Sequence, residues 1–328
     1  MPKFTVGDVT VRQGEIGFGG LGEISLPDTT SIKIPLIVVN GSHNGPTLML
    51  SSTIHGTELA GAEVIRRITR EIVKPQDLRG KIIALPIGNP LAFSAHTANT
   101  PQDCFNLNRV FPGSPTGSTT DRLADAITAN AVSKSDLIID FHANPDPAMC
   151  FTITERYRPD VDRKVIAMAE AFGITNIMTT PELEPHVVGT LDEVAANFGL
   201  PALVVELLYW RRQNPIAVNV GVRGALNVMK KFEMLDGPVE KQTDTPVVNG
   251  TLSRVEVTAD RGGIVHPTRE IAQWVKKGEA VAKILNPYGD VVSKVLSPVN
   301  GFMLAYPLLG NQAVTSGDHV AFIGFRRR

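Results

Sequence analysis

The stretch "LMLSSTIHGTELAGAEVIRRI", residues 48–68, contains the change from strand to helix on which the prediction of the fold rests. Its first half is a continuous apolar run, which is typical of a strand buried on both faces of a sheet. Its second half has apolar residues at helical spacing. A strand that leads directly into a helix indicates the repeating units of an α/β protein. His55 and Glu58 lie at the junction, where open parallel sheets bind their ligands.

The same alternation continues to about residue 235. Further apolar runs predict strands at 81–88, 137–143 and 202–208. Helical patterns separate or follow these strands at 120–132, 162–172, 191–198 and 214–235. We therefore predict an α/β fold with a mixed, mostly parallel sheet and helices on both faces. Residues 1–45 show the short alternating patterns of additional strands.

The pattern changes after residue 235. Residues 236–248 are polar and contain prolines, which predicts a linker. Residues 249–328 carry short strand patterns and glycine turns without a convincing helix, which predicts a small all-β domain. The expected organisation is an α/β domain over 1–235, a linker over 236–248 and a β domain over 249–328.

Composition narrows the class of protein. The 328 residues are 43% hydrophobic and 20% charged with a net charge of −1, which is ordinary for a globular protein and disfavours a nucleic-acid partner. No run of about 18 apolar residues predicts a membrane span, and the first residues lack the apolar core of a signal peptide. Two cysteines, Cys104 and Cys150, fit a reducing cytoplasm. The sequence leaves assembly into a homo-oligomer open.

A glycine motif at residues 17–22, "GFGGLG", matches the spacing of a dinucleotide-binding loop. Such a loop must be followed by a helix, whereas "EISLPDTT" follows here. We therefore interpret the motif as a glycine-rich β turn.

A candidate metal site combines His55 and Glu58 with His142, which ends the strand pattern "LIIDFHA". Histidine nitrogens and carboxylate oxygens are zinc ligands, and three protein ligands with one open position are typical of catalytic zinc. Asp140 points to the same side of its strand as His142 and is expected to orient it through a hydrogen bond. The alternatives are a hydrogen-bonded loop histidine at position 55 and a helix-start glutamate at position 58. Other histidines, including His186, lack a comparable context.

Two further features of the sequence indicate residues that take part in catalysis or substrate binding. Glu206 lies within an apolar strand pattern, where an unpaired carboxylate is costly, so it is either a general base or a satisfied structural group. The polar segment 88–113 is long for a simple connection and ends in Asn108 and Arg109. An arginine fork beside an amide suits a substrate carboxylate, although a surface ion pair is the simpler alternative.

The order of these motifs resembles that of a known family. H-x-x-E at 55–58, N-P-x-A at 89–92, N-L-N-R-x-F-P-G at 106–113, D-x-H at 140–142 and P-A-L-x-x-E at 201–206 resemble the succinylglutamate desuccinylase and aspartoacylase family, a branch of the zinc carboxypeptidase-like fold. The resemblance covers about residues 40–235, and the C-terminal part looks like the lipoyl-like β domain of that family.

The resemblance implies a hydrolase that uses one zinc ion per chain to cleave the amide of a small N-acylated amino acid. It implies that His55, Glu58 and His142 bind zinc and that Glu206 is the base for a zinc-bound water. It further implies that Asn108 and Arg109 bind the carboxylate of a small-molecule substrate. A metallocarboxypeptidase acting on short peptides and a non-catalytic metal- or ligand-binding relative remain the alternatives.

One position departs from the family pattern. The family motif G-T-R-x-x-P-x-D corresponds to "HTANTPQD", residues 96–103, so Ala98 stands where the family has an arginine. That arginine polarises the scissile carbonyl, and loss of such a donor typically costs about 10²- to 10³-fold in rate. Either zinc alone polarises the carbonyl, another cation such as Arg211 or Arg212 does so, or the substrate differs.

Overall fold

The structure is a computed structural model, and it describes residues 2–179, 187–208, 211–308 and 312–327. His186, mentioned above among the other histidines, lies outside the described residues.

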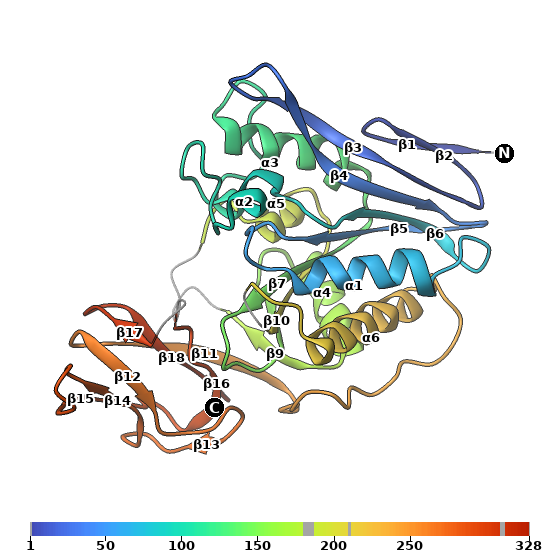
Figure 1. Cartoon of the computed structure of the whole chain (residues 1–328). Helices are drawn as coiled ribbons and strands as arrows, with labels where there is room; N and C mark the ends of the chain where they lie inside the picture. Colours follow the sequence, from blue (N-terminus) through green and yellow to red (C-terminus); the bar gives the residue numbers. More distant parts are fainter. Residues whose placement is uncertain (1, 180–186, 209–210, 309–311, 328) are drawn as a thin grey trace.

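A large mixed sheet forms the centre of the molecule (Figure 1). In the α/β region its strands, in the order β9-β8-β10-β7-β5-β6-β4-β3, are β3 (Glu15–Ser25), β4 (Ser31–Asn40), β5 (His43–Ser52), β6 (Arg79–Leu85), β7 (Leu137–Asn144), β8 (Phe151–Thr154), β9 (Thr175–Met178) and β10 (Ala202–Leu208). The central strands β6, β5, β7 and β10 are parallel, while β8 runs antiparallel to β10. The carboxyl ends of β5, β7 and β10 therefore meet at one edge.

Helices cover both faces of this sheet, and each face has its own hydrophobic core. One layer contains α1 (Ala60–Arg67) with its π-helical extension η1 (Ile68–Ile72), α4 (Pro159–Phe172) and α6 (Pro215–Lys231). The opposite layer contains α2 (Pro90–Ala95), α3 (Thr119–Asn130) and α5 (Leu191–Asn197), with the short turns η2 (Leu107–Arg109) and η3 (Val132–Lys134). Figure 1 shows the two groups of helices on either side of the strands. The predicted α/β fold is thus confirmed.

The sequence of α1 explains its position. Ala60, Val64 and Ile65 are buried at helical spacing, so this face packs on the sheet. Glu63 lies in the first turn and Arg66 in the last, which stabilises the helix dipole. The short elements α2, β8 and β9 were not predicted, because runs of four to six residues carry little periodic signal.

The glycine motif at 17–22 lies inside strand β3, so the prediction of a β turn is wrong. Gly17 and Gly19 lie so close to the hairpin of β1 (Lys3–Val6) and β2 (Val9–Arg12) that a Cβ atom would be less than 3.0 Å from its side chains. These glycines therefore allow the hairpin to pack closely on the strand.

The C-terminal region is all-β, as predicted. Its strands are β11 (Thr251–Thr258), β12 (Gly263–Pro267), β13 (Trp274–Val275), β14 (Ala280–Leu285), β15 (Val291–Leu296), β16 (Gly301–Ala305), β17 (Ala313–Val314) and β18 (His319–Phe325). β11 pairs with β9 over two residues and so extends the central sheet, while β15, β14, β12 and β17 form a separate sheet. A shared core of residues such as Phe151, Leu252 and Leu304 joins the two regions. The domain limits and the lipoyl-like character stay predictions.

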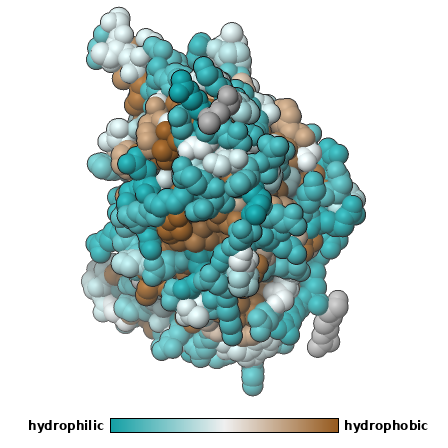
Figure 2. All heavy atoms as spheres, turned by 90° about the vertical axis from the view of Figure 1, so that its right-hand side faces the viewer, coloured by the Kyte–Doolittle hydropathy of each residue, from teal (hydrophilic) through white to brown (hydrophobic). Residues whose placement is uncertain are grey.

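The hydropathy of the surface and of the helices shows where apolar side chains are exposed and whether a helix could cross a membrane. Figure 2 shows one face of the molecule that is mostly hydrophilic, with hydrophobic side chains gathered near its middle. Within the described residues, no helix combines the length and apolar character that a membrane crossing requires.

Candidate active site

The turn after β5 places His55 and Glu58 at the carboxyl edge of the sheet. Thr53 has a φ of 53°, which redirects the chain as it leaves the strand, and the Glu58 amide donates to the His55 carbonyl at 3.1 Å. Gly56 fits against the backbone of α2, since a Cβ atom there would lie 2.2 Å from the carbonyl carbon of Ala92. This glycine is therefore required by close packing. Glu58 precedes α1, which begins at Ala60.

Three side chains converge at this edge. The two oxygens of the Glu58 carboxylate each lie 2.9 Å from a histidine Nδ1 atom, one from His55 and the other from His142. One ligand atom from each of the three residues lies within 4.8 Å of the others. Glu58 and His142 are 7% and 4% exposed, so the cluster is largely shielded from water. Among the described residues it is the group of histidine and acidic side chains that could hold a metal ion.

The outer nitrogen of each histidine has a fixed partner. His142 Nε2 lies 2.9 Å from Asp140 Oδ2, which is the contact expected from their spacing along β7. His55 Nε2 lies 3.0 Å from Asn106 Oδ1, a residue that we did not single out from the sequence. Asn106 is the first residue of the N-L-N-R motif, so the motif itself was the available signal. These contacts orient both rings so that their Nδ1 atoms face Glu58.

The charges in this cluster depend on one another. Burial alone would raise the pKa of Glu58, but the charges of His55 and His142 hold that pKa well below its usual range. Burial alone would lower the pKa of His142, yet Asp140 and Glu58 hold it well above its usual range. A buried carboxylate that needs nearby positive charge is therefore the centre of this site.

Glu206 lies next to this cluster on β10. Its register partner on the neighbouring strand β7 is His142, and its Oε2 accepts a hydrogen bond of 3.0 Å from Asn144 Nδ2. The pKa of Glu206 is raised to about 7, mainly by burial, with the charge of Glu58 also raising it and the charges of His142 and Arg254 opposing the increase. A carboxyl with a pKa near neutrality is suited to accept and return a proton.

Asn108 and Arg109 reach the same cavity from the 3₁₀ turn that ends the polar segment. Asn108 Oδ1 accepts a hydrogen bond of 2.9 Å from the Leu191 amide, so this residue also anchors the start of α5. Arg109 Nη1 donates to the Asn108 carbonyl at 2.6 Å. Burial lowers the pKa of Arg109, and the charge of Asp192 opposes this effect.

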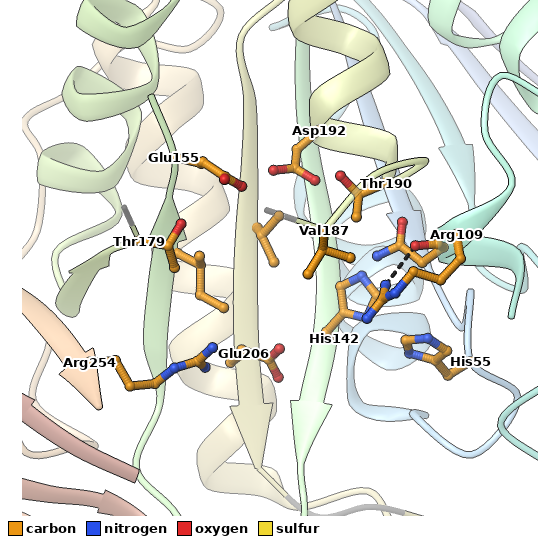
Figure 3. A pocket seen from close by; sticks show the side chains of 13 residues that line it. His55, Arg109, His142, Glu155, Thr179, Val187, Thr190, Asp192, Glu206 and Arg254 are labelled. Carbon is orange, nitrogen blue, oxygen red and sulfur yellow. Dashed lines mark hydrogen bonds between the residues drawn. The ribbon is translucent and has the colours of Figure 1, made fainter. Parts of the chain in front are cut away.

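Two adjoining cavities share His55, His142 and Glu206. The first extends over the face of the sheet, and its wall includes three charged residues that the sequence did not reveal, namely Glu155, Asp192 and Arg254 (Figure 3). The second lies between the metal-ligand candidates and the C-terminal region, including Leu308, His319 and Phe322. The C-terminal region therefore contributes to the walls of both cavities.

A cation that we did not name from the sequence lies near the site that lacks the arginine expected at position 98. Neither Arg211 nor Arg212 is among the described residues that line the two cavities. Arg254, on β11, lines the first cavity and its side chain is only 13% exposed. It pairs with Glu256 at 3.1 Å and lies 4.7 Å from the ring centre of Phe322. Arg254 thus brings a positive charge to the cavity from the C-terminal region.

Comparisons with known proteins agree with this architecture. The chain is 24% identical over 273 residues to an N-alpha-acetyl-L-2,4-diaminobutyric acid deacetylase of Halomonas elongata, with 82% of this chain and 78% of that protein covered. A product-bound structure of the ectoine utilization protein EutE (DoeB) from Ruegeria pomeroyi has the same fold, with a TM-score of 0.85, 22% identity, and 96% and 98% of the two chains covered.

A succinylglutamate desuccinylase/aspartoacylase structure from Rhodobacter sphaeroides is 27% identical, with a TM-score of 0.82 and 95% and 96% of the chains covered. Residues 44–232 match the model of the succinylglutamate desuccinylase/aspartoacylase catalytic domain, which includes every metal-ligand candidate, Glu206 and Arg109. The chain therefore belongs to the succinylglutamate desuccinylase/aspartoacylase family.

Proposed function

We propose that this protein is a zinc-dependent hydrolase that cleaves the amide bond of a small N-acylated amino acid. The observation that carries the proposal is the convergence of His55, Glu58 and His142 beside Glu206 in the wall of the second cavity. Membership in a family that includes amide-cleaving relatives supports it.

The donor set fits a zinc ion. Both histidines present a Nδ1 atom to Glu58, and the opposite nitrogen of each ring is held by Asp140 or Asn106. Two nitrogens and one carboxylate oxygen match the protein ligands of catalytic zinc sites and leave a position for another ligand. Zinc would supply the positive charge that the buried Glu58 carboxylate requires, and its binding would displace the protons shared between Glu58 and the histidines.

Bound zinc would supply Lewis acidity toward the substrate carbonyl and a water molecule. Glu206 then accepts the proton of the attacking water and transfers it to the leaving nitrogen. The hydrogen bond from Asn144 fixes one carboxylate oxygen of Glu206 and leaves the other to move the proton. Burial keeps the proton affinity of Glu206 high enough for both transfers.

Substrate binding is assigned to the two cavities. Arg109 carries a guanidinium that can pair with the α-carboxylate of the amino acid, and Asn108 supplies an amide beside it. The second cavity, with Leu308 and Phe322 in its wall, suits the acyl group on the other side of the scissile bond. The substrate is thus a small molecule with an amide and a carboxylate.

The structure weighs against long peptides as substrates. The C-terminal region supplies much of the wall beside His55 and His142, which limits the space available for an extended chain. A role restricted to metal or ligand binding is disfavoured because Glu206 is positioned beside the metal-ligand candidates with a pKa near neutrality.

A substrate screen tests the proposal. Zinc-loaded protein is incubated with N-acetyl and N-succinyl amino acids and with dipeptides, and the released amine is quantified. We expect release from at least one N-acyl amino acid, dependent on zinc and absent in Glu206→Gln. Release from dipeptides alone would support the carboxypeptidase, and no release from any compound would favour a binding protein.

A further inference from the structure

Two buried polar atoms beside the metal-ligand candidates have no hydrogen-bond partner among the described residues. Asp140 is 1% exposed, and its Oδ2 lies 2.9 Å from His142 Nε2, whereas its Oδ1 has no partner. Ser51, near the end of β5, is completely buried, and its Oγ has no partner either. A buried polar group without a partner destabilises the folded state, so each of these atoms requires an explanation.

The register of the sheet brings these two side chains together. β5 and β7 are parallel neighbours, and Ser51 is the register partner of Asp140. Adjacent strands lie about 4.8 Å apart and register partners point to the same face, so the hydroxyl and the carboxylate are side by side. Met49 and Ile138, two residues earlier on each strand, accordingly belong to one hydrophobic core. On the other side of Ser51, its register partner on β6 is the apolar Leu85.

The other neighbours of Asp140 on this face cannot donate to its Oδ1 atom. Its register partner on β10 is Val204, and Ile138 lies two residues before it on β7, so both of these neighbours are apolar. His142, two residues after it, already contacts Oδ2. Ser51 is therefore the neighbour in register whose side chain carries a hydrogen-bond donor.

We propose that Ser51 positions the metal-ligand candidate His142 by donating a hydrogen bond to Asp140 Oδ1, directly or through one buried water molecule. A serine hydroxyl can rotate between staggered rotamers, and a water molecule can bridge two polar groups that do not touch. With both oxygens of Asp140 held, the plane of the carboxylate is fixed, and with it the orientation of the imidazole ring. A carboxylate at Nε2 also favours the tautomer that leaves the Nδ1 lone pair for a metal ion. This inference rests on the proposed zinc site, because it gives Ser51 a task in presenting one of the ligands.

A double-mutant cycle tests this contact. Zinc affinity is measured by competition with a chromophoric chelator for the wild type, Ser51→Ala, Asp140→Ala and the double variant. Asp140→Ala should lower zinc affinity by about 10- to 100-fold, which is typical for a residue that orients a metal-bound histidine. Ser51 acts one step further from the metal, so Ser51→Ala should lower affinity by about 3- to 10-fold. In the Asp140→Ala background the same substitution should have no further effect, because its partner is gone.

Thr128→Val is the matched control. Thr128 lies in α3, away from the sheet edge, is 7% exposed, and its hydroxyl also has no partner among the described residues. Its removal should leave zinc affinity unchanged and should not lower the melting temperature, since an unsatisfied hydroxyl is lost. Ser51→Ala should instead lower the melting temperature of the metal-free protein, because Asp140 Oδ1 loses its donor. This loss should also disappear in the Asp140→Ala background.

Unchanged zinc affinity and melting temperature in Ser51→Ala, or losses that add fully to those of Asp140→Ala, would overturn the inference and leave the zinc site intact. Absence of zinc binding in the wild type, together with coupling of the two substitutions in the melting temperature, would support the hydrogen bond and contradict the zinc site. The inference and the proposed function therefore fail in different measurements.

Discussion

The α/β region and the C-terminal β region contribute differently to the same cavities. The α/β region supplies all three metal-ligand candidates and Glu206 from the ends of neighbouring strands. The C-terminal region supplies wall residues, with Arg254 in one cavity and His319 and Phe322 in the other. The candidate catalytic groups therefore lie at the sheet edge, whereas the shape and charge of the cavities also depend on the C-terminal part of the chain.

We expect the largest effect from removing a candidate metal-binding side chain at the sheet edge. His55→Ala should abolish zinc binding and reduce amide hydrolysis to background, because two remaining donors cannot hold the ion tightly. Metal content by mass spectrometry and melting temperature would be measured together. The matched control is His319→Ala: His319 lines a cavity but its Nδ1 pairs with Glu256 at 3.0 Å, so that variant should keep zinc. Full zinc occupancy in His55→Ala would contradict the ligand assignment.

The second prediction distinguishes the role of Glu206 as a general base from the role of the metal-ligand candidates at the same sheet edge. Glu206→Gln should keep about one zinc per chain and lower kcat by about 10²- to 10⁴-fold, since an amide cannot accept the proton of water. The side chain keeps its size and its oxygen can still accept from Asn144. Near-normal turnover would assign Glu206 a structural role.

The third prediction concerns recognition of the substrate carboxylate by Arg109 in the polar segment 88–113. Arg109→Ala should lower kcat/KM by about 10²-fold through the loss of a charged contact with the substrate carboxylate. The loss should nearly disappear on a substrate whose α-carboxylate is replaced by a neutral amide. Equal losses on both substrates would argue against carboxylate binding by Arg109.

The smallest effect tests electrostatic coupling between the two regions. Glu206 must be ionised to act, so kcat/KM should fall as the pH drops through its pKa, which is about 7 without metal and lower beside a zinc ion. Arg254 lowers this pKa, so Arg254→Met should raise it and move the acid limb of the pH profile to higher pH. An unchanged acid limb in Arg254→Met would show that the C-terminal charge does not reach the base.

Much of the residue cluster at the carboxyl edge of the sheet was predictable because its signals are local. His55, Glu58, Asp140 and His142 each lie within or just after an apolar run that forms a strand, and strand ends in open parallel sheets meet at one edge. Glu206 was conspicuous as a carboxylate in an apolar strand. Contacts between distant segments were not predictable. Asn106 lies 51 positions from His55, and nothing in the spacing reveals their contact.

The α/β class, the all-β C-terminal region and the residues that converge at the sheet edge could be read from the sequence alone, because hydrophobic periodicity and polar residues at strand ends are properties of short segments. The tertiary structure was needed to show that Arg254 lines the same cavity as Glu206. It was also needed to show that Glu155 and Asp192, which line that cavity too, both lie within hydrogen-bond distance of the Tyr157 hydroxyl. Those contacts depend on strand order and on the two-residue pairing of β11 with β9, which no local pattern specifies.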